Sequence, residues 1–369
     1  MKKHDKIDHQ LDLGVDHPSP SIDPPDLLAC DKWIASSAMQ KAIRRGDVET
    51  ARRAAATFHH ADPRAVWRRL LIIAVEDVGI GSPEALIETA LRASDPKLRR
   101  WMGGELTAIL DTCQLLASSP KSRNADHLIS TGVHDPALET VREECGGSSV
   151  QRRIEIVADR TRPLPERAIA AWHGCGLEAG REHRVGVGDF AGLMRAFADL
   201  GVPTLLLDAV GIAARKTREP IIITIPLLWL AADEGGTAIV DHPPPETALI
   251  DGVPVYALDG HTRLGRQAIR QFRRENREVS ELLDGHVLDH RVARVLQLAV
   301  FYADSAVIRP CLVWPGSEVL EARGVAADFH SAETDPAVGV QLIEIVVRHL
   351  PQLNAIRADL LTRGGVRPR

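Results

Sequence analysis

We expect a mainly helical, all-α fold, and three features of the sequence predict it. Aromatic residues make up 4% of the chain, whereas Ala, Leu, Ile, Val and Arg are abundant, a composition typical of packed helices rather than sheets. Between residue 31 and about residue 130, short polar residues recur just before a Pro or a helix former, as an N-cap and a first turn require. Apolar residues such as Val66, Leu70 and Ile73 lie between these signals at helical spacing.

The length of the chain predicts two helical domains with tails, because 369 residues exceed one ordinary core of roughly 150 residues. We place the first domain at 31–130, where N-cap signals stand at Asp47, Asp62, Ser82 and Asp95. Their spacing favours a compact antiparallel bundle. The predicted helices are 33–45, 48–59, 63–78, 83–93, 96–118 and 121–130.

The second helical domain is predicted at 163–350, with a run of three prolines at 243–245 as a break. Residues 253–258 have the composition of a short strand, but the sequence shows no partner strand for them. The predicted helices are 165–174, 189–200, 203–217, 221–233, 262–277, 287–303 and 336–349.

Three further segments are predicted to lie outside the domains. Residues 1–30 mix charges with prolines and have little apolar surface to offset the entropy of ordering, so we expect a disordered tail. Residues 131–162 contain Asp135-Pro136 and a run of glycine and serine at 146–149, which is typical of a linker. Residues 351–369 are predicted to be a basic C-terminal tail.

Charge, cysteine content and hydropathy exclude several classes of protein. A formal charge of -5 argues against a protein that coats nucleic acid with its whole surface, but leaves room for a local basic patch. The five cysteines are scattered without a CxxC pair, which favours reduced thiols. The amino terminus has no apolar signal segment, and the longest apolar run, 221–232, is shorter than the roughly 20 residues that span a bilayer. We therefore expect a cytoplasmic location and no membrane partner.

Nucleotide hydrolysis is not expected from this sequence. A glycine-rich turn that leads into a helix, with a lysine to reach the phosphates, is absent both as GxxxxGK[ST] and as GxGxxG. The pair Lys121-Ser122 follows Pro120 rather than a glycine loop. We expect neither a cofactor nor a metal.

Three segments carry a resemblance to a known family. They are SAMQKAIRRGD (37–47), AVEDVGIGSPEAL (74–86) and LASSPKSRNA (116–125). In the same order and at similar spacing, they resemble segments of the C-terminal helical domain of the replication-associated recombination protein A family, which are clamp-loader-like AAA+ ATPases. The matching positions are Ser37, Ala38, Lys41, Glu76, Asp77, Gly79, Pro83, Pro120, Lys121 and Ser122.

The resemblance implies a helical collar at 31–130 that assembles family members into oligomers beside an ATPase ring at stalled replication forks. In the family the ATPase precedes the collar, whereas here a short tail precedes it. We therefore expect no motor activity from this chain. From the resemblance we still expect a homo-oligomer, or a collar that recruits a partner.

The charged family positions have structural explanations that we favour over chemical ones. Glu76 and Asp77 could act as acid and base or bind a metal. Their place beside Gly79, just before a helix capped at Ser82, better suits hydrogen bonds to exposed backbone donors. Lys41, like the arginines that follow it, is expected to interact favourably with the dipole of the first helix.

An arginine stripe is the most informative feature outside the resemblance. If Thr262 caps a helix, six arginines fall within an arc of about 100°, while Leu264, Ala268, Ile269 and Phe272 fall on the opposite side. The six are Arg263, Arg266, Arg270, Arg273, Arg274 and Arg277.

Like charges on one stripe repel one another unless a bound anion neutralises them. Nucleic-acid phosphate is one candidate, because arginine forks suit it and counterion release favours binding. The alternatives are a solvated face and pairing with the acidic residues of 278–289. The tryptophans are spread singly, as core or interface anchors are, so no base-stacking platform accompanies the stripe.

Asp259 and His261, just before this helix, are weak catalytic candidates. Together with His286, Asp289 and His290 they could bind a metal or move protons if they met in the fold. No HExxH or comparable spacing is present, so a local turn at Asp259-Gly260 is the default interpretation.

These observations give a leading function and two alternatives. The leading hypothesis is a non-ATPase accessory protein of DNA replication or recombination, which binds DNA or an acidic protein partner through a helical collar and an arginine-rich helix. The first alternative is an enzyme of unknown reaction that uses Asp259 and His261. The second is a pure protein-interaction scaffold.

Overall fold

The computed structural model describes residues 25–177 and 187–364. The predicted all-α class is confirmed, since 19 α-helices and four short strands make up the described part of the chain. Residues 1–24 of the predicted disordered tail lie outside the described residues. The helices of the first half are α1 (Lys32–Arg44), α2 (Val48–Ala61), α3 (Val66–Ile73), α4 (Pro83–Ser94), α5 (Pro96–Trp101), α6 (Glu105–Ser118), α7 (Asn124–His134), α8 (Glu139–Gly147), α9 (Val150–Ala158) and α10 (Leu164–Cys175).

The second half continues with helices and two small antiparallel pairs of strands, β1 with β4 and β2 with β3. Its helices are α11 (Phe190–Asp199), α12 (Thr204–Thr217), α13 (Thr224–Gly235), α14 (Arg263–Glu275), α15 (Arg277–His286), α16 (Val292–Val300), α17 (Ser317–Ser331), α18 (Pro336–Arg348) and α19 (Leu350–Gly364). The strands are β1 (Ala238–Val240), β2 (Leu249–Ile250), β3 (Val253–Pro254) and β4 (Cys311–Val313). Short 3-10 turns are η2 (Gly79–Gly81), η3 (Pro136–Leu138), η4 (Pro220–Ile223) and η5 (Val255–Ala257), and π-helical turns are η1 (Ala74–Val78) and η6 (Phe301–Ser305).

Two predicted helices of the first half differ from those observed. The helix predicted over 96–118 is broken into α5 and α6, because Gly103 and Gly104 have φ of 96° and 108°, a backbone region that glycine adopts far more readily than other residues. The helix predicted over 63–78 begins at Val66 and widens after Ile73 into η1.

Segments predicted as linker or tail are helical instead. The predicted linker 131–162 contains η3, α8 and α9, and residues 350–364 form α19 rather than the start of a tail. Arg153 of α9 is buried and donates hydrogen bonds to the carbonyls of Cys145 and His173, which fixes α9 against α8 and α10. The buried apolar residues form one continuous cluster from Leu28 to Leu361. The domain boundaries that we predict stay predictions.

The region around the arginine stripe contains a helix break where the sequence predicts a continuous helix. The helix predicted over 262–277 ends at Glu275, because Asn276 leaves the helical conformation and caps α15 by accepting a hydrogen bond from the amide of Val279. The predicted strand 253–258 is only partly extended. Its first two residues pair with β2, and η5 follows.

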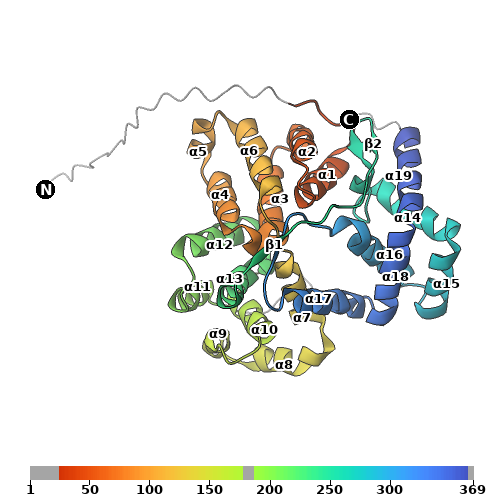
Figure 1. The fold of residues 1–369 in the computed structure, drawn as a ribbon. Helices are drawn as coiled ribbons and strands as arrows, with labels where there is room; N and C mark the ends of the chain where they lie inside the picture. Colours follow the sequence, from red (N-terminus) through yellow and green to blue (C-terminus); the bar gives the residue numbers. More distant parts are fainter. Residues whose placement is uncertain (1–24, 178–186, 365–369) are drawn as a thin grey trace.

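The last third of the chain packs back against the first third. α17 lies along α7, and Cys311 of β4 forms a β-bridge with Lys121. β4 also pairs with β1, and α19 covers α14 within the last third. In Figure 1, α14, α15, α16, α18 and α19 lie on one side of the molecule, and α11, α12 and α13 lie on the other. The first helices, α1 to α3, lie between these groups, with α1 in contact with η5 and α3 in contact with α12.

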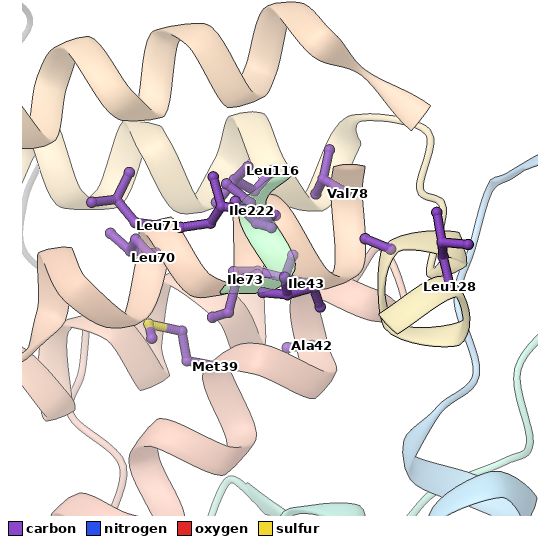
Figure 2. Packing of buried hydrophobic residues seen from close by; sticks show 14 of the residues in the cluster. Met39, Ala42, Ile43, Leu70, Leu71, Ile73, Val78, Leu116, Leu128 and Ile222 are labelled. Atoms are coloured by element: carbon purple, nitrogen blue, oxygen red, sulfur yellow. The ribbon is translucent and has the colours of Figure 1, made fainter. Parts of the chain in front are cut away.

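Apolar side chains from distant segments meet around α1 and α3. Figure 2 shows Met39 and Ile43 of α1 facing Leu70 and Ile73 of α3, with Ile222 of η4 close by. All five are at most 1% exposed. Full burial of such a side chain stabilises the fold by roughly 1.5–3 kcal/mol, so this cluster holds the buried end of α1 in place.

An arrangement of three helices occurs twice in the chain. α1, α2 and α3 end in the π turn η1, and α14, α15 and α16 end in the π turn η6. The fourth residue of each π turn is a buried aspartate, Asp77 and Asp304. Consecutive arginines at the end of α1, Arg44 and Arg45, bind one aspartate each. This junction positions the candidate site.

Candidate functional site

Asp77 is fully buried and is held by side chains of α1 rather than by backbone donors. Its carboxylate accepts hydrogen bonds from Arg44 Nε at 2.6 Å and from Gln40 Nε2 at 2.8 Å, and Arg123 Nε lies 3.7 Å away. The expectation that this side chain binds exposed backbone amides is therefore wrong. Its neighbour Glu76 is half-buried, with Gln40 Nε2 at 3.4 Å. Burial, followed by the nearby charges of Asp77 and Asp126, raises the pKa of Glu76 to about 7.

Lys41 is buried at the same end of α1, where it contacts residues more than 200 positions away. Its ammonium donates to Asp259 Oδ2 and to the carbonyl of Tyr256, both at 2.7 Å, and to Ser37 Oγ at 3.0 Å. Burial lowers the pKa of Lys41 to about 8, although the charge of Asp259 opposes that shift. The helix dipole alone therefore does not explain this lysine, since a specific ion pair joins α1 to the turn before α14.

The Asp259 carboxylate is occupied on both oxygens. Oδ1 accepts the amides of His261 at 2.9 Å and Thr262 at 3.2 Å, and Oδ2 accepts Lys41 and, at 3.1 Å, Ser37. Burial alone would raise the pKa of Asp259, but the charge and hydrogen bond of Lys41 outweigh it and hold the pKa well below its usual range. A carboxylate bound in this way orders the turn and anchors Lys41, and it is a poor proton acceptor.

His261 lies near Asp259 at the surface, and the other predicted histidines lie elsewhere. The side chain of His261 is exposed and borders the same cleft as Asp259. His286 ends α15, and Asp289 and His290 are exposed in the turn that follows, away from this cleft. Among the described residues, no group of histidines, cysteines and carboxylates is arranged to hold a metal ion.

Lys121 lies in the third family segment, next to the residue that binds the second segment. Its ammonium is fully buried and donates to the carbonyls of Ala117 and Ser119, both at 2.7 Å. Burial lowers the pKa of Lys121 to about 7. The next amide, that of Ser122, donates to the carbonyls of Asp77 and Val78 at 3.1 Å. Asp77 thus connects α1 with the segment before α7, since its side chain binds Arg44 and its carbonyl accepts the amide of Ser122.

A cleft of about 610 Å³ opens above this junction. It is bordered by α1, α3, η1, the start of α7, the turn before α14 and η6. The cleft therefore brings together Lys41 and Glu76 of the family segments with Asp259 and His261 of the second half. The remaining lining residues are Trp33, Ser36, Ser37, Gln40, Arg44, Phe58, Ala65, Arg68, Arg69, Arg123, Asp126 and Phe301.

Several charged residues at this junction are not predicted from the sequence. Arg69, Arg123 and Asp126 line the cleft, and Asp304 with Arg357 of α19 forms a buried pair of 2.6 Å beside it. One signal could have found Asp304, which follows an apolar helix as Asp77 does. Arg357 gave no such signal, because it lies in the segment predicted to be a tail.

The arginine stripe occupies the exposed side of α14, and Leu264, Ala268, Ile269 and Phe272 are buried as predicted. Three of its members have partners within the protein. Arg273 binds Asp284 and Arg277 binds Glu281, both at 2.6 Å, and Arg266 donates to the carbonyls of residues 260 and 261. Arg277 belongs to α15 rather than to α14. The other three, Arg263, Arg270 and Arg274, are exposed and have no hydrogen bond or ion pair to any described residue.

One curated protein matches part of the chain. It is the replication-associated recombination protein A of Bacillus subtilis (strain 168), 36% identical over 106 residues, which are 27% of this chain. The chain spans about a quarter of the length of that relative, 24%. No family model matches the chain, and no solved structure matches it. The chain is therefore weakly related to that family over part of its length.

The sequence predicts no membrane-spanning segment, and the helices of the described segments can be compared with that prediction. None of them combines the length and the apolar content that a bilayer crossing requires.

Proposed function

We propose that this chain is an accessory protein of DNA replication or recombination that binds duplex DNA through α14. The partial match to a replication-associated recombination protein supports the role. The observation that carries the proposal is the set of three exposed arginines without an intramolecular partner, Arg263, Arg270 and Arg274.

The geometry of these three arginines suits a phosphate backbone. At 100° per residue they fall within an arc of about 40°, narrower than the full stripe, and they extend over about 16 Å of the helix. Three guanidinium groups on one line repel one another in the free protein, and neutralisation by phosphates relieves that repulsion. Binding releases counterions condensed on the DNA. A local basic face can therefore bind DNA even on a chain with a formal charge of -5.

A salt titration of duplex binding tests this proposal. Replacing Arg263, Arg270 and Arg274 with Ala should weaken binding at low salt by at least tenfold. Each lost phosphate contact should also reduce the slope of log K against log salt by about 0.9.

The matched control is the triple replacement of Arg152, Arg195 and Arg215 with Ala. These arginines are exposed on α9, α11 and α12, so this variant loses the same charge on the other side of the molecule. It should keep the parent slope. Equal losses in both variants, or a parent that does not bind DNA at low salt, would contradict the proposal.

The enzyme hypothesis is less well supported than DNA binding. Asp259 and His261 do meet at one cleft, which is the minimum that such a hypothesis needs. However, four hydrogen bonds occupy the Asp259 carboxylate, so we assign it to holding Lys41 and the start of α14.

A further inference from the structure

The cleft beside α1 has the dimensions of a site for a small organic ligand. Its volume of about 610 Å³ lies within the roughly 300–1,000 Å³ of such sites. Its walls come from both halves of the chain, and its floor is fixed by the Lys41–Asp259 and Arg44–Asp77 pairs. A rigid floor of this kind lowers the cost of binding, because few side chains need to be ordered when the ligand enters.

The charged lining of the cleft favours an anion. Five cationic side chains line it against three carboxyl groups. Lys41, Arg44 and Arg123 each have a carboxylate partner inside the protein, and Arg68 forms an exposed pair with Glu219. Arg69 alone has no carboxylate within salt-bridge distance among the described residues. Its guanidinium donates to Gln40 Oε1 at 2.5 Å, and its Nε has no hydrogen-bond partner.

A second unsatisfied donor belongs to another residue that lines the same cleft. Arg123 is 4% exposed, and its Nε also has no hydrogen-bond partner, since Asp77 is 3.7 Å away. Buried donors without acceptors are costly, so an acceptor group that reaches them would be strongly favoured. Glu76, a carboxyl group seven residues after Arg69, also lines the cleft, and with a pKa raised to about 7 it carries only part of a negative charge near neutral pH.

The rim of the cleft carries an exposed aromatic ring. Trp33 at the start of α1 is 65% exposed although its indole is large and apolar. Stacking of a nucleic-acid base on such a ring contributes roughly 1–3 kcal/mol and does not depend strongly on which base it is. A cationic floor next to an exposed indole matches a ligand that has both an acidic group and a flat ring.

We propose that this cleft binds a nucleoside monophosphate group, with the base stacked on Trp33 and the phosphate bound by Arg69 and Arg123. The group is either a free nucleotide or the 5′-phosphorylated end of a DNA strand. This inference rests on the proposed role in replication for the choice of a nucleotide over other ring-bearing anions. It does not rest on DNA binding by α14, since the two surfaces share no residue.

Equilibrium dialysis of the full chain against labelled dAMP tests the inference. The Arg69→Gln variant should bind dAMP at least tenfold more weakly than the parent, because a charge-assisted hydrogen bond to the phosphate is lost. The matched control is Arg64→Gln, which removes an exposed arginine just before α3 and outside the cleft. That control should bind dAMP as the parent does.

The stacking partner is tested by a pair of tryptophan variants. Trp33→Ala should lower the affinity for dAMP by about five- to tenfold and leave the affinity for inorganic phosphate unchanged. Trp101→Ala removes an indole that is 72% exposed and lies away from the cleft. This variant should bind dAMP and inorganic phosphate with the affinities of the parent. Far-ultraviolet circular dichroism of each variant shows whether the fold is kept.

Two oligonucleotides distinguish the sources of the ligand. If a 5′-phosphorylated single strand binds more tightly than its 5′-hydroxyl form, and Arg69→Gln abolishes the difference, the ligand is a strand end. If dAMP binds and the strands do not, it is a free nucleotide.

The inference is overturned if the parent shows no saturable dAMP binding, or if Arg69→Gln and Trp33→Ala bind dAMP like their controls. The triple replacement of Arg263, Arg270 and Arg274 should leave dAMP binding intact. Failure of the α14 proposal is therefore distinguishable from failure of this one.

Discussion

Lys121 shows how a single buried charge links stability to pH. Its ammonium group has two carbonyl acceptors and no carboxylate within salt-bridge distance among the residues that the structure describes. Burial therefore lowers its pKa to about 7, whereas an unfolded lysine titrates near 10.4. Between these two values the unfolded chain binds a proton that the folded chain lacks. The free energy of unfolding contributed by Lys121 therefore rises as the pH rises through this window.

Lys121→Met should remove this dependence on pH. Urea unfolding at pH 7, 8 and 9 should show the parent gaining stability relative to the variant, on the order of 2 kcal/mol over the range. Lys41, whose pKa is lowered to about 8, is present in both proteins and cancels in the difference. Lys97→Met removes an exposed lysine and should give a curve parallel to that of the parent. If the stability of Lys121→Met also changes with pH in parallel with that of the parent, Lys121 is not the source of the pH dependence.

At the residue scale, the sequence could identify charged positions but not their partners. Lys41, Glu76, Asp77 and Lys121 were singled out because they match a family pattern. The partner of Lys41 is Asp259, 218 positions away, and no spacing rule reaches that far. The sequence therefore predicts local interactions, with a helix dipole and with backbone amides, whereas long-range ion pairs form in the folded chain.

At the element scale, predictions held where a strong periodic pattern met clear caps. α1 and α2 begin after Asp31 and Asp47, whose side chains accept the amides of the first turn. α17 and α19 were missed because their apolar residues do not gather on one face, and Pro351 in the first turn of α19 resembles a break. Both helices are nevertheless well packed, because tertiary contacts determine the structure of a segment whose intrinsic helix propensity is neutral.

Gly79 shows how one backbone position joins two elements. It ends η1 with φ of 50° and ψ of -131°, and an added Cβ would lie 2.9 Å from the carbonyl oxygen of Ser122. This backbone conformation is essentially confined to glycine, and the neighbouring oxygen is backbone that cannot move aside cheaply. The family segments that contain Glu76 and Lys121 therefore pack closely only because glycine stands between them.

Gly79→Ala should destabilise the fold by at least about 2 kcal/mol, as the sum of backbone strain and overpacking. The matched variant is Gly285→Ala in α15, where nothing lies within 4 Å of the added Cβ and φ is helical. That change should be neutral or stabilising by about 0.5–1 kcal/mol. Thermal unfolding of the two variants measures the contrast, and similar midpoints would show that Gly79 has no special role.

At the scale of the whole molecule, the sequence predicted the fold class but not how its parts meet. The helix–helix–helix–π turn order occurs twice, and the similar stretches LLIIAVED and LQLAVFYAD could have revealed it. The packing of both π turns on α1 could not be predicted. It depends on Arg44 and Arg45 reaching Asp77 and Asp304, which lie 33 and 259 positions away.

Asp304 is the point where the two ends of the described chain are joined. Its carboxylate binds Arg45, the residue that follows α1, and, at 2.6 Å, Arg357 of α19, and all three side chains are at most 4% exposed. Two guanidinium groups around one carboxylate are stable only while that negative charge is present. Removing one partner of a buried ion pair typically costs about 3–5 kcal/mol, because the remaining charge is left uncompensated.

Asp304→Asn should therefore loosen α1 and α19 together, although they are far apart in the sequence. Hydrogen exchange followed by mass spectrometry should show faster exchange in both helices, with a loss of stability of about 3–5 kcal/mol. Asp359→Asn is the control, because Asp359 lies on α19 and pairs with Arg363 at the surface. An exposed pair contributes about 0–1 kcal/mol, so this control should change exchange only locally. If Asp304→Asn affects α19 and leaves α1 protected, then Arg45 is held by other contacts and the two ends of the chain are stabilised independently.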